Sequence, residues 1–568
     1  MIRTFRRAPG AAVLTLVLGL ALGAVEVAQS ADATPSPHRL WVFLADKGLT
    51  RADEGVAVAR AAATLSPRAL ARRAKVGMPV TVRDVPVAPE HVGAVEATGA
   101  RVVVRSRWLN AVSVEADASQ AAAIAALPFV REVRPVARAR KELPQLVPTA
   151  PATPRGGRSL DYGPALGQLD QIQVPDLHDQ GFDGSGVLIA MFDTGFDTDH
   201  QAYRHLDVVA ERDFINNDAV TADQPGDPPG QDSHGTATLS CVGGAYAGQL
   251  YGGSYRGSFA LAKTERVDTE IQAEEDHWVA AAEWADSLGA DVISSSLGYL
   301  DWYTYEDMDG NTAVTTIAAD MAAARGVVVV NSMGNEGGSA WRYMIAPADG
   351  DSVVAVGAVN SDGIRVSFSS VGPTYDGRIK PDVMAQGRHV YVATTSDTAS
   401  YATASGTSFS CPLTAGAVGL LLQAHPHWTP SMVIEALRET ATQSASPDTL
   451  MGWGIVQAAD AMVHQPSGVP GDEGGGSRRP VVSASRSPFD AGTALSYFVP
   501  GDGRARVAVY DVAGRLVRVL ADGRRPAGWH AAAWDGADAA GAPVASGVYF
   551  ARVIAAGRSA VAKLVVVR

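Results

Sequence analysis

The stretch Val187-Leu-Ile-Ala-Met-Phe-Asp-Thr-Gly195 determines how the central part of this chain folds. Its six apolar residues in a row are typical of a parallel strand that is buried on both faces. The run ends at Asp193, and an Asp-Thr-Gly turn follows it. The sequence therefore predicts a rigidly held carboxylate, shielded from water, at the end of a buried strand.

Similar apolar runs recur after this stretch and alternate with Ala-rich helical patterns. The runs are Asp291–Ser295, Val327–Val330 and Val353–Val356, and the helical patterns are Glu274–Leu288 and Thr407–Ala424. Strands that alternate with helices predict an α/β fold over residues 160–465, with a mainly parallel sheet between helices.

A small α+β module is predicted before this region, in residues 34–140. Ser66 can cap a helix from Pro67 to Lys75, because Ser is a favoured N-cap and Pro fits the first helical turn. A second helix is expected over Gln120–Ala126. The expected strands are His38–Leu44, Arg101–Arg105, Ala111–Glu115 and Val130–Val136.

An all-β sandwich is predicted at the other end, in residues 481–568. Short alternating strands are separated there by turn residues such as Asp535-Gly536. The expected strands are Ala494–Val499, Arg504–Tyr510, Leu516–Leu520, Trp529–Trp534, Val548–Ile554 and Ala560–Val567.

The remaining segments have the composition of targeting and linking sequences. Residues 1–33 have a basic start, an apolar stretch and small residues at the end, which is the layout of a secretory signal peptide; the alternative is an uncleaved membrane anchor. Residues 141–159 and 466–480 are expected to be linkers, and the first could be processed by a protease. No second long apolar run follows, so we expect no integral membrane segment in the mature form.

Charge is unevenly distributed along the chain. The net charge is -13, which argues against nucleic acid as a partner. Residues 34–159 contain 19 Lys and Arg against 10 Asp and Glu, a net charge of +9, while residues 160–568 carry -23. A basic segment ahead of an acidic body indicates that the two dock together.

Two further motifs supply a candidate nucleophilic serine and the imidazole that it needs. A serine hydroxyl is a poor nucleophile near neutral pH, so it requires an imidazole to take its proton and a third group to orient that imidazole. His234 begins a small-residue helical segment in Asp232-Ser-His-Gly-Thr236. Ser408, in Gly406-Thr-Ser-Phe-Ser-Cys-Pro412, starts a helix whose free N–H groups favour negative charge.

Asn335 completes the set, because an Asn side chain on a glycine-bounded loop can donate to an oxyanion. The order Asp193, His234, Asn335, Ser408 excludes two competing enzyme classes: α/β-hydrolases have the order Ser-Asp-His and chymotrypsin-like peptidases His-Asp-Ser.

With these motifs, residues 160–465 resemble the subtilisin-like serine peptidases, or subtilases. The resemblance implies that Asp193 is the orienter, His234 the general base and then acid, and Ser408 the nucleophile. It implies that Asn335 and the backbone N–H of Ser408 hold the oxyanion. It also implies that Ser296, Leu297 and Gly298 pair with the substrate backbone.

The flanking segments carry resemblances of their own. Residues 34–140 resemble a subtilase propeptide, a folding chaperone and temporary inhibitor, which implies self-cleavage within about 137–160; the alternative is a permanent regulatory domain. Residues 481–568 resemble the immunoglobulin-like C-terminal modules of flagellar hook-capping proteins and type IX secretion cargo. That resemblance implies sorting and cell-surface attachment, or a stabilising spacer.

Cysteine and metal chemistry are expected to have a small part. Cys241 and Cys411 are the two cysteines of the chain, and we expect free, buried thiols; a disulfide is the alternative, because the resemblance places them in neighbouring helices. No cofactor is required. The resemblance implies structural calcium, but Asp197 and Asp199 form no complete ligand set and are expected to be solvated loop acids.

The sequence thus predicts a secreted serine endopeptidase, extracellular or at the cell surface. It would hydrolyse protein or peptide substrates through an Asp-His-Ser triad and an acyl-enzyme, and its own propeptide would be a further partner. The alternative is an inactive subtilase-like binding or adhesion protein.

Overall fold

The structure is a computed structural model, and it describes most of the chain outside the N-terminus and the linkers. The described residues are 38–135, 138–139, 147–148, 158–268, 270–271, 273–466, 481–484, 489, 492–499, 503–512, 514–525, 528–555 and 558–567. The expected signal peptide (1–33) and most of both expected linkers lie outside these residues. Among the described residues no helix is both long and apolar enough to cross a membrane.

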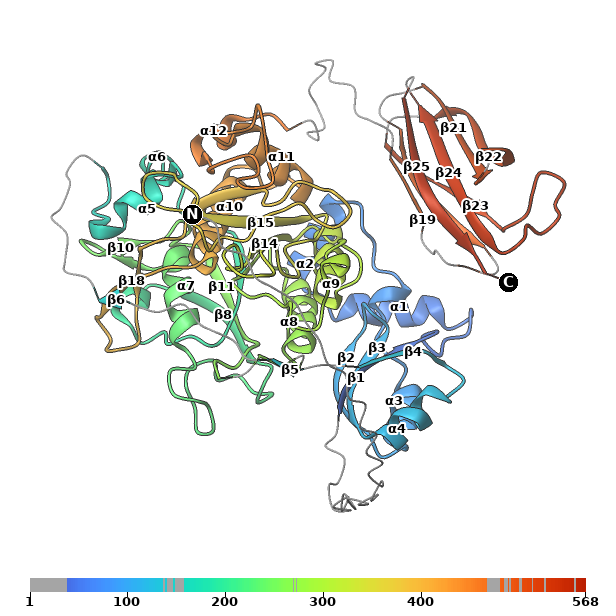
Figure 1. The fold of residues 1–568 in the computed structure, drawn as a ribbon, viewed down its shortest axis with the longest axis horizontal. Coiled ribbons are helices and arrows are strands. Elements are labelled where there is room, and N and C mark those ends of the chain that lie inside the picture. Colours follow the sequence, from blue (N-terminus) through green and yellow to red (C-terminus); the bar gives the residue numbers. More distant parts are fainter. Residues whose placement is uncertain are drawn as a thin grey trace, which may run out of the picture.

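The first module contains a four-stranded antiparallel sheet in the order β2-β3-β1-β4, with helices packed on it (Figure 1). Its strands are β1 His38–Leu44, β2 Arg101–Ser106, β3 Ala111–Ala116 and β4 Val130–Pro135. Its helices are α1 Glu54–Ala63, α2 Pro67–Lys75, α3 Pro89–Glu96 and α4 Ala118–Ala125. The Ser66 hydroxyl accepts from the Ala69 N–H at 3.0 Å, so the predicted cap is confirmed.

The central region is built on a seven-stranded parallel sheet in the order β16-β15-β14-β13-β7-β11-β8. The strands are β7 Leu188–Asp193, β8 Asp207–Asp213, β11 Ser258–Lys263, β13 Val292–Ser295, β14 Val328–Ser332, β15 Val353–Val359 and β16 Val383–Gln386. The principal helices are α7 Ser233–Gly243, α8 Ala273–Leu288, α9 Val314–Ala324 and α10 Thr407–Ala424. The predicted α/β class is confirmed.

Two hydrophobic cores lie on opposite faces of this sheet. Ile189 and Met191 of β7 belong to the core that also contains α7 and α10. Leu188, Ala190 and Phe192 belong to the core that contains α8 and α9. This alternation along β7 is the two-residue period of a strand that is buried on both faces.

Shorter elements surround the sheet. The helices are α5 Leu166–Asp170, α6 Val174–Asp179, α11 Pro430–Thr440 and α12 Ala458–Val463. The strands are β5 Arg138–Ala139, β6 Val147–Pro148, β9 Ala245–Tyr246, β10 Leu250–Tyr251, β12 Glu270–Ile271, β17 Val390–Ala393 and β18 Tyr401–Ala404.

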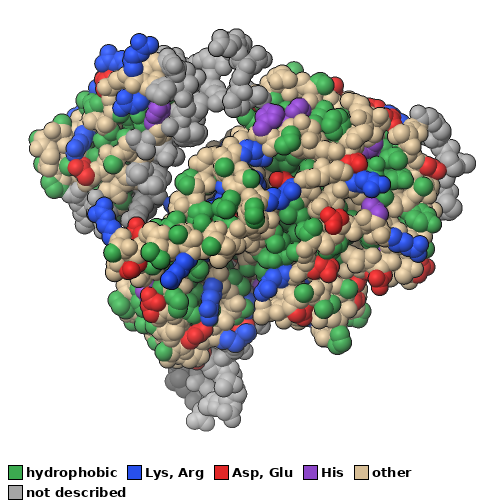
Figure 2. Space-filling view, turned by 180° about the vertical axis from the view of Figure 1, so that it is seen from behind, with side chains coloured by type: hydrophobic (Ala, Val, Ile, Leu, Met, Phe, Trp, Pro, Cys, Tyr) green, Lys and Arg blue, Asp and Glu red, His purple; other side chains and the backbone are tan. Residues whose placement is uncertain are grey.

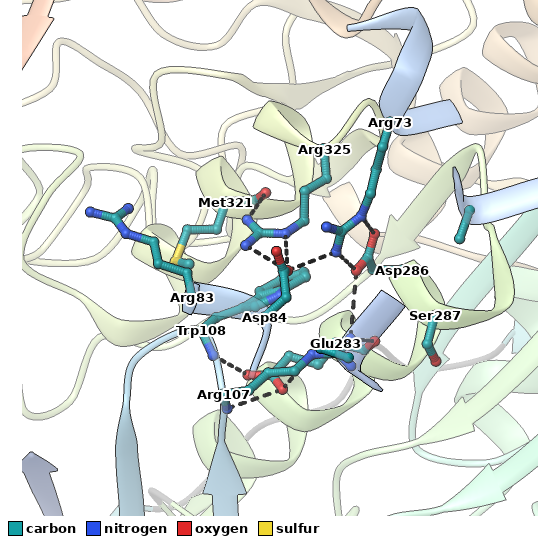
Figure 3. Close-up of polar contacts among 12 residues, drawn as sticks. Arg73, Arg83, Asp84, Arg107, Trp108, Glu283, Asp286, Ser287, Met321 and Arg325 are labelled. Carbon is teal, nitrogen blue, oxygen red and sulfur yellow. Dashed lines mark hydrogen bonds and ion pairs between the residues drawn. The ribbon is translucent and has the colours of Figure 1, made fainter. Parts of the chain in front are cut away.

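The first module docks on α8 and α9 through buried charged side chains (Figure 3). Asp286 of α8 accepts hydrogen bonds from Arg72 and Arg73, and all three side chains are almost fully buried. Arg325, which follows α9, donates to Asp84 at 3.1 Å. The expected docking of a basic segment on an acidic body is therefore confirmed.

The C-terminal module consists of two antiparallel sheets, β19-β20-β23 and β22-β21-β24-β25. The strands are β19 Val481–Ala484, β20 Thr493–Val499, β21 Gly503–Asp511, β22 Leu516–Arg525, β23 Gly528–Trp534, β24 Gly547–Ala555 and β25 Arg558–Val566. Side chains from both sheets share one core, with Trp534 only 1% exposed. The predicted sandwich is confirmed, and β19 is a strand that the sequence did not predict.

Candidate functional site

The candidate site lies at the carboxyl ends of the central strands, where loops from several strands of a parallel sheet converge. Asp193 is the last residue of β7, which lies between β13 and β11. The segment Ser296–Gly298 follows β13, and Asn335 follows β14. The topology thus gathers residues that are far apart in the sequence.

Asp193 is fully buried and is held by three donors. The Thr194 N–H donates to Oδ1 and the Thr238 hydroxyl donates to Oδ2, both at 2.8 Å. His234 Nδ1 lies 2.6 Å from Oδ1. Burial alone would raise the pKa of Asp193, but His234 and these hydrogen bonds hold it below its ordinary value. The group therefore stays a carboxylate.

His234 lies in the first turn of α7 and reaches Asp193 because of a close backbone approach. A Cβ at Gly235 would lie 2.0 Å from the Gly195 carbonyl oxygen, so only glycine fits there. Because the carboxylate accepts at Nδ1, the proton of a neutral ring lies on Nδ1 and the lone pair on Nε2. Nε2 is buried and has no hydrogen-bond partner among the described residues.

Ser408 is the second residue of α10. The ring of the next residue, Phe409, has its centre 5.9 Å from that of His234. The Ser408 hydroxyl donates to the Ser296 carbonyl at 3.4 Å, and no hydrogen bond joins it to His234. The structure thus brings Asp193 and His234 into direct contact, places the ring of Phe409 near the imidazole, and turns the Ser408 hydroxyl toward Ser296.

Asn335 is oriented by Thr407, the residue before Ser408. Asn335 Oδ1 accepts from the Thr407 N–H at 2.9 Å and from its hydroxyl at 3.1 Å. Thr407 Oγ1 also accepts from the Gly334 N–H at 3.2 Å. These contacts fix which side of the amide is the acceptor, so Nδ2 is the side of Asn335 that can donate to another group.

The segment Ser296–Gly298 is hydrogen-bonded to Ser408 and to Asn331. The Ser296 hydroxyl donates to the Ser408 carbonyl at 2.7 Å. Buried Asn331 donates from Nδ2 to the Leu297 carbonyl at 3.0 Å. These hydrogen bonds hold the segment in register with Ser408.

Sequence reasoning did not identify four residues that position this site: Thr194, Thr238, Asn331 and Thr407. Three of them are threonines inside or next to the quoted motifs, and this proximity is the signal that could have revealed them. Asn331 lies four residues before Asn335, and nothing in this spacing indicated a contact with Leu297.

Asp197 and Asp199 were expected to be solvated loop acids rather than a complete set of metal ligands. Asp197 Oδ1 accepts from the Asp199 N–H at 2.9 Å, which is an ordinary turn contact. No group of three His, Cys, Asp or Glu side chains in the described part of the chain could hold a metal ion. The turn contact fits the expected role of Asp197 and Asp199 as loop acids.

Cys241 and Cys411 are buried free thiols, as expected. Burial raises the pKa of each thiol to about 12, so both remain protonated near neutral pH. They act as small apolar side chains in the core between α7 and α10.

The chain that leaves the first module pairs with two strands of the central region. Arg138 and Ala139 of β5 pair antiparallel with Ile271 and Glu270 of β12. Further on, β6 pairs antiparallel with β18, the strand that ends four residues before Ser408.

The described side chains on the face in Figure 2 have Lys and Arg interspersed with Asp and Glu, so that face presents no continuous basic surface.

Comparison with family models finds three matches along the chain. Residues 184–454 match the subtilase family. Residues 39–147 match the peptidase S8 propeptide domain of Bacteroidota, and residues 489–559 match the FlgD Ig-like domain.

Characterised proteins and solved structures give similar results. Subtilisin of Bacillus pumilus is 34% identical over 292 residues, which are 51% of this chain and 94% of that protein. Subtilisin E of Bacillus subtilis (strain 168) is 34% identical over 288 residues, 50% of this chain and 67% of that protein. Fervidolysin from Fervidobacterium pennivorans, a keratinolytic enzyme related to subtilisin, has a similar fold at 20% identity. Its TM-score is 0.56, with 92% of this chain and 71% of that chain covered.

Proposed function

Because the chain belongs to the subtilase family of serine peptidases, we propose that it is a secreted endopeptidase whose triad is Asp193, His234 and Ser408. The 2.6 Å contact between Asp193 and His234 carries this proposal, and the position of Ser408 at the start of α10, directly before Phe409 whose ring lies near His234, supports it. In this proposal Asp193 is the orienter, His234 the base and Ser408 the nucleophile that acyl transfer requires.

The proposed reaction begins when the Ser408 hydroxyl turns from the Ser296 carbonyl to His234 Nε2. Nε2 takes the hydroxyl proton as Oγ attacks the carbonyl carbon of the scissile bond. The Asp193 carboxylate stabilises the imidazolium that forms. The imidazolium then gives the proton to the leaving amine, and water releases the acyl group from Ser408 by the same steps in reverse order.

The oxyanion of the tetrahedral intermediate would lie between Asn335 Nδ2 and the backbone N–H of Ser408. Thr407 supports this role, because its hydrogen bonds to Oδ1 orient Nδ2 as the donor. The N-terminal end of α10, with 18 residues, adds a favourable dipole at the same place. The substrate backbone would pair with Ser296, Leu297 and Gly298, which Asn331 and Ser408 hold in place.

We also propose that residues 34–140 are cut off by this same site. The pairing of β5 with β12 and of β6 with β18 supports a bond between Ala139 and Val147 as the first to be hydrolysed. Buried ion pairs such as Arg73–Asp286 would keep the released fragment bound as an inhibitor until it is degraded.

Localisation and the C-terminal module belong to the same proposal. The composition of residues 1–33 supports secretion. Residues 481–568 would sort or attach the enzyme to the cell surface; a spacer role predicts instead that deleting them leaves the distribution between cells and medium unchanged. The proposed chemistry requires no cofactor.

A serine-directed fluorophosphonate probe and a protein substrate test the proposal together. The matured protein is expected to take up the probe and to hydrolyse casein, and Ser408→Ala is expected to do neither. Failure of the matured protein to react with the probe, or equal labelling after Ser408→Ala, would contradict the enzyme and favour the inactive binding or adhesion protein.

A further inference from the structure

We infer that Ile345 fills the pocket for the substrate side chain just before the scissile bond and restricts that side chain to a small one. This inference rests on the proposed function. It names a residue that determines specificity and a substrate class, peptides with Ala or a similarly small residue at that position.

Two glycines border the space in question. Gly298 ends the segment proposed to pair with the substrate, and Gly334 precedes the proposed oxyanion donor Asn335. The residue before the scissile bond would have its carbonyl at Asn335 and its backbone along Ser296–Gly298. Its side chain would therefore enter the space between these glycines.

The tip of Ile345 already occupies that space. A Cβ built on Gly298 would lie 2.4 Å from Ile345 Cδ1, and one built on Gly334 would lie 3.1 Å from the same atom. Gly334 has a φ of +102°, so a larger residue is disfavoured there in any case. The side chain of Ile345 thus lies directly against both backbones.

Ile345 is not a core residue that merely passes nearby. Its neighbours Met344 and Ala346 are 0% exposed and belong to one hydrophobic core. Ile345 is partly exposed and belongs to none of the cores formed by the described residues. A partly exposed apolar side chain that packs against two glycines beside the proposed substrate segment can form the wall of a substrate pocket.

Hydrogen bonds hold the backbone around Ile345, so the side chain cannot easily be moved aside. The Ile345 N–H donates to the Met333 carbonyl at 3.4 Å. Ala346 and Tyr299 exchange two backbone hydrogen bonds, of 2.9 and 3.1 Å. Since Ile is branched at Cβ, few side-chain rotamers are open to it. A bulky substrate side chain would have to displace a branched residue that is fixed on both sides.

The proposed processing region of the chain points to the same preference. Eight residues, 139–146, could precede a bond cut between Ala139 and Val147, and Ala139 is the only small one. Ala139 is also the last described residue of β5, and it pairs with Glu270 of β12. We therefore expect hydrolysis of the Ala139–Arg140 bond, with water giving a carboxylate on Ala139 and a free amine on Arg140.

Two peptides that differ only in Ala or Phe before the scissile bond test the inference on the matured protein. We expect kcat/KM for the Ala peptide to exceed that for the Phe peptide by about 100-fold, since one misfit group in a pocket commonly discriminates by 10- to 200-fold. Ile345→Ala is expected to shift the Phe-to-Ala ratio toward Phe by tenfold or more. Ile345→Val should shift this ratio less, in the same direction. The Val variant provides the test if the Ala variant is unstable.

Ile364→Ala is the matched control, because it removes the same atoms from a side chain that is 64% exposed, and the ratio should not change. A parent enzyme that prefers Phe, or an unchanged ratio in both Ile345 variants, would overturn the inference while fluorophosphonate labelling still supports the proposed function. Loss of labelling and of both activities in the parent would overturn the proposed function and the inference with it.

The maturation reaction provides a second readout. The first cleavage product of the full chain is expected to begin at Arg140, and Ala139→Phe should slow its appearance at least tenfold. Ile345→Ala in the same chain should restore much of the rate. A first product that begins after a bulky residue, or an unchanged rate in Ala139→Phe, would contradict the inference.

Discussion

Asp286 is the residue through which the docking of the first module can be tested most sharply. Its carboxylate, at 0% exposure, accepts from Arg72 and Arg73, each with a side chain 2% exposed. Asp286→Asn keeps the shape of the side chain but removes the ion-pair partner of buried Arg72 and one of the two ion-pair partners of buried Arg73, which keeps Asp84. Breaking a buried ion pair from one side typically costs about 3–5 kcal/mol. Docking should therefore weaken by roughly two to nearly four orders of magnitude.

Hydrogen exchange of the uncut chain measures this change directly. Ser408→Ala keeps the chain intact, and Asp286→Asn is compared in that background. The amides of α2 are the reporters, because a helix of nine residues is not stable in water once it leaves its partner. Their opening free energy is expected to fall by about 3–5 kcal/mol.

A surface ion pair of the same module is the control. Arg105 and Glu96 lie 3.4 Å apart with side chains 59% and 48% exposed. Glu96→Gln should change the opening free energy by less than about 0.5 kcal/mol, as expected for an exposed pair. A loss below about 1 kcal/mol in Asp286→Asn would refute the view that this buried network holds the module in place.

Three further predictions concern the site and the acidic helix beside it. Asn335→Ala is expected to lower kcat by about 10²–10³ with little change in KM, and steady-state kinetics that show a KM effect alone would contradict the oxyanion role. Thr238→Val removes a hydrogen bond to Asp193, so kcat/KM should fall about tenfold and the acid limb of its pH profile should move to higher pH; an unmoved limb would speak against this positioning role. Burial raises the pKa of Glu275 to about 8, so its contribution to stability is complete below its unfolded pKa near 4.5 and is lost as the pH rises toward 8. Glu275→Gln should therefore gain in Tm over the parent between pH 5 and 8, and a constant difference would contradict this.

The residues that carry chemistry could be predicted from the sequence because each lies in a local pattern. Asp193 ends an apolar run, and His234 and Ser408 begin helices, so their positions follow from strand and helix boundaries. The helix that begins at Pro67 was predictable for the same reason, since its cap is formed by its own neighbour Ser66.

Contacts between distant segments could not be predicted in this way. Thr238 reaches Asp193 across 45 positions and Asn331 reaches Leu297 across 34, and neither pairing leaves a trace in local spacing. Strand β8 was missed because it alternates between half-buried and exposed residues at the edge of the sheet, so its sequence lacks an apolar run. The turn of the Ser408 hydroxyl toward Ser296 depends on a rotamer, which no sequence pattern specifies.

The most direct test of the proposed triad is to locate the fluorophosphonate label by peptide mass mapping of the matured protein. We predict that the label lies on Ser408 and that His234→Ala slows its attachment by at least 10³-fold, because an unassisted hydroxyl reacts slowly. A label on another serine, or an undiminished rate in His234→Ala, would contradict the assignment of Asp193, His234 and Ser408.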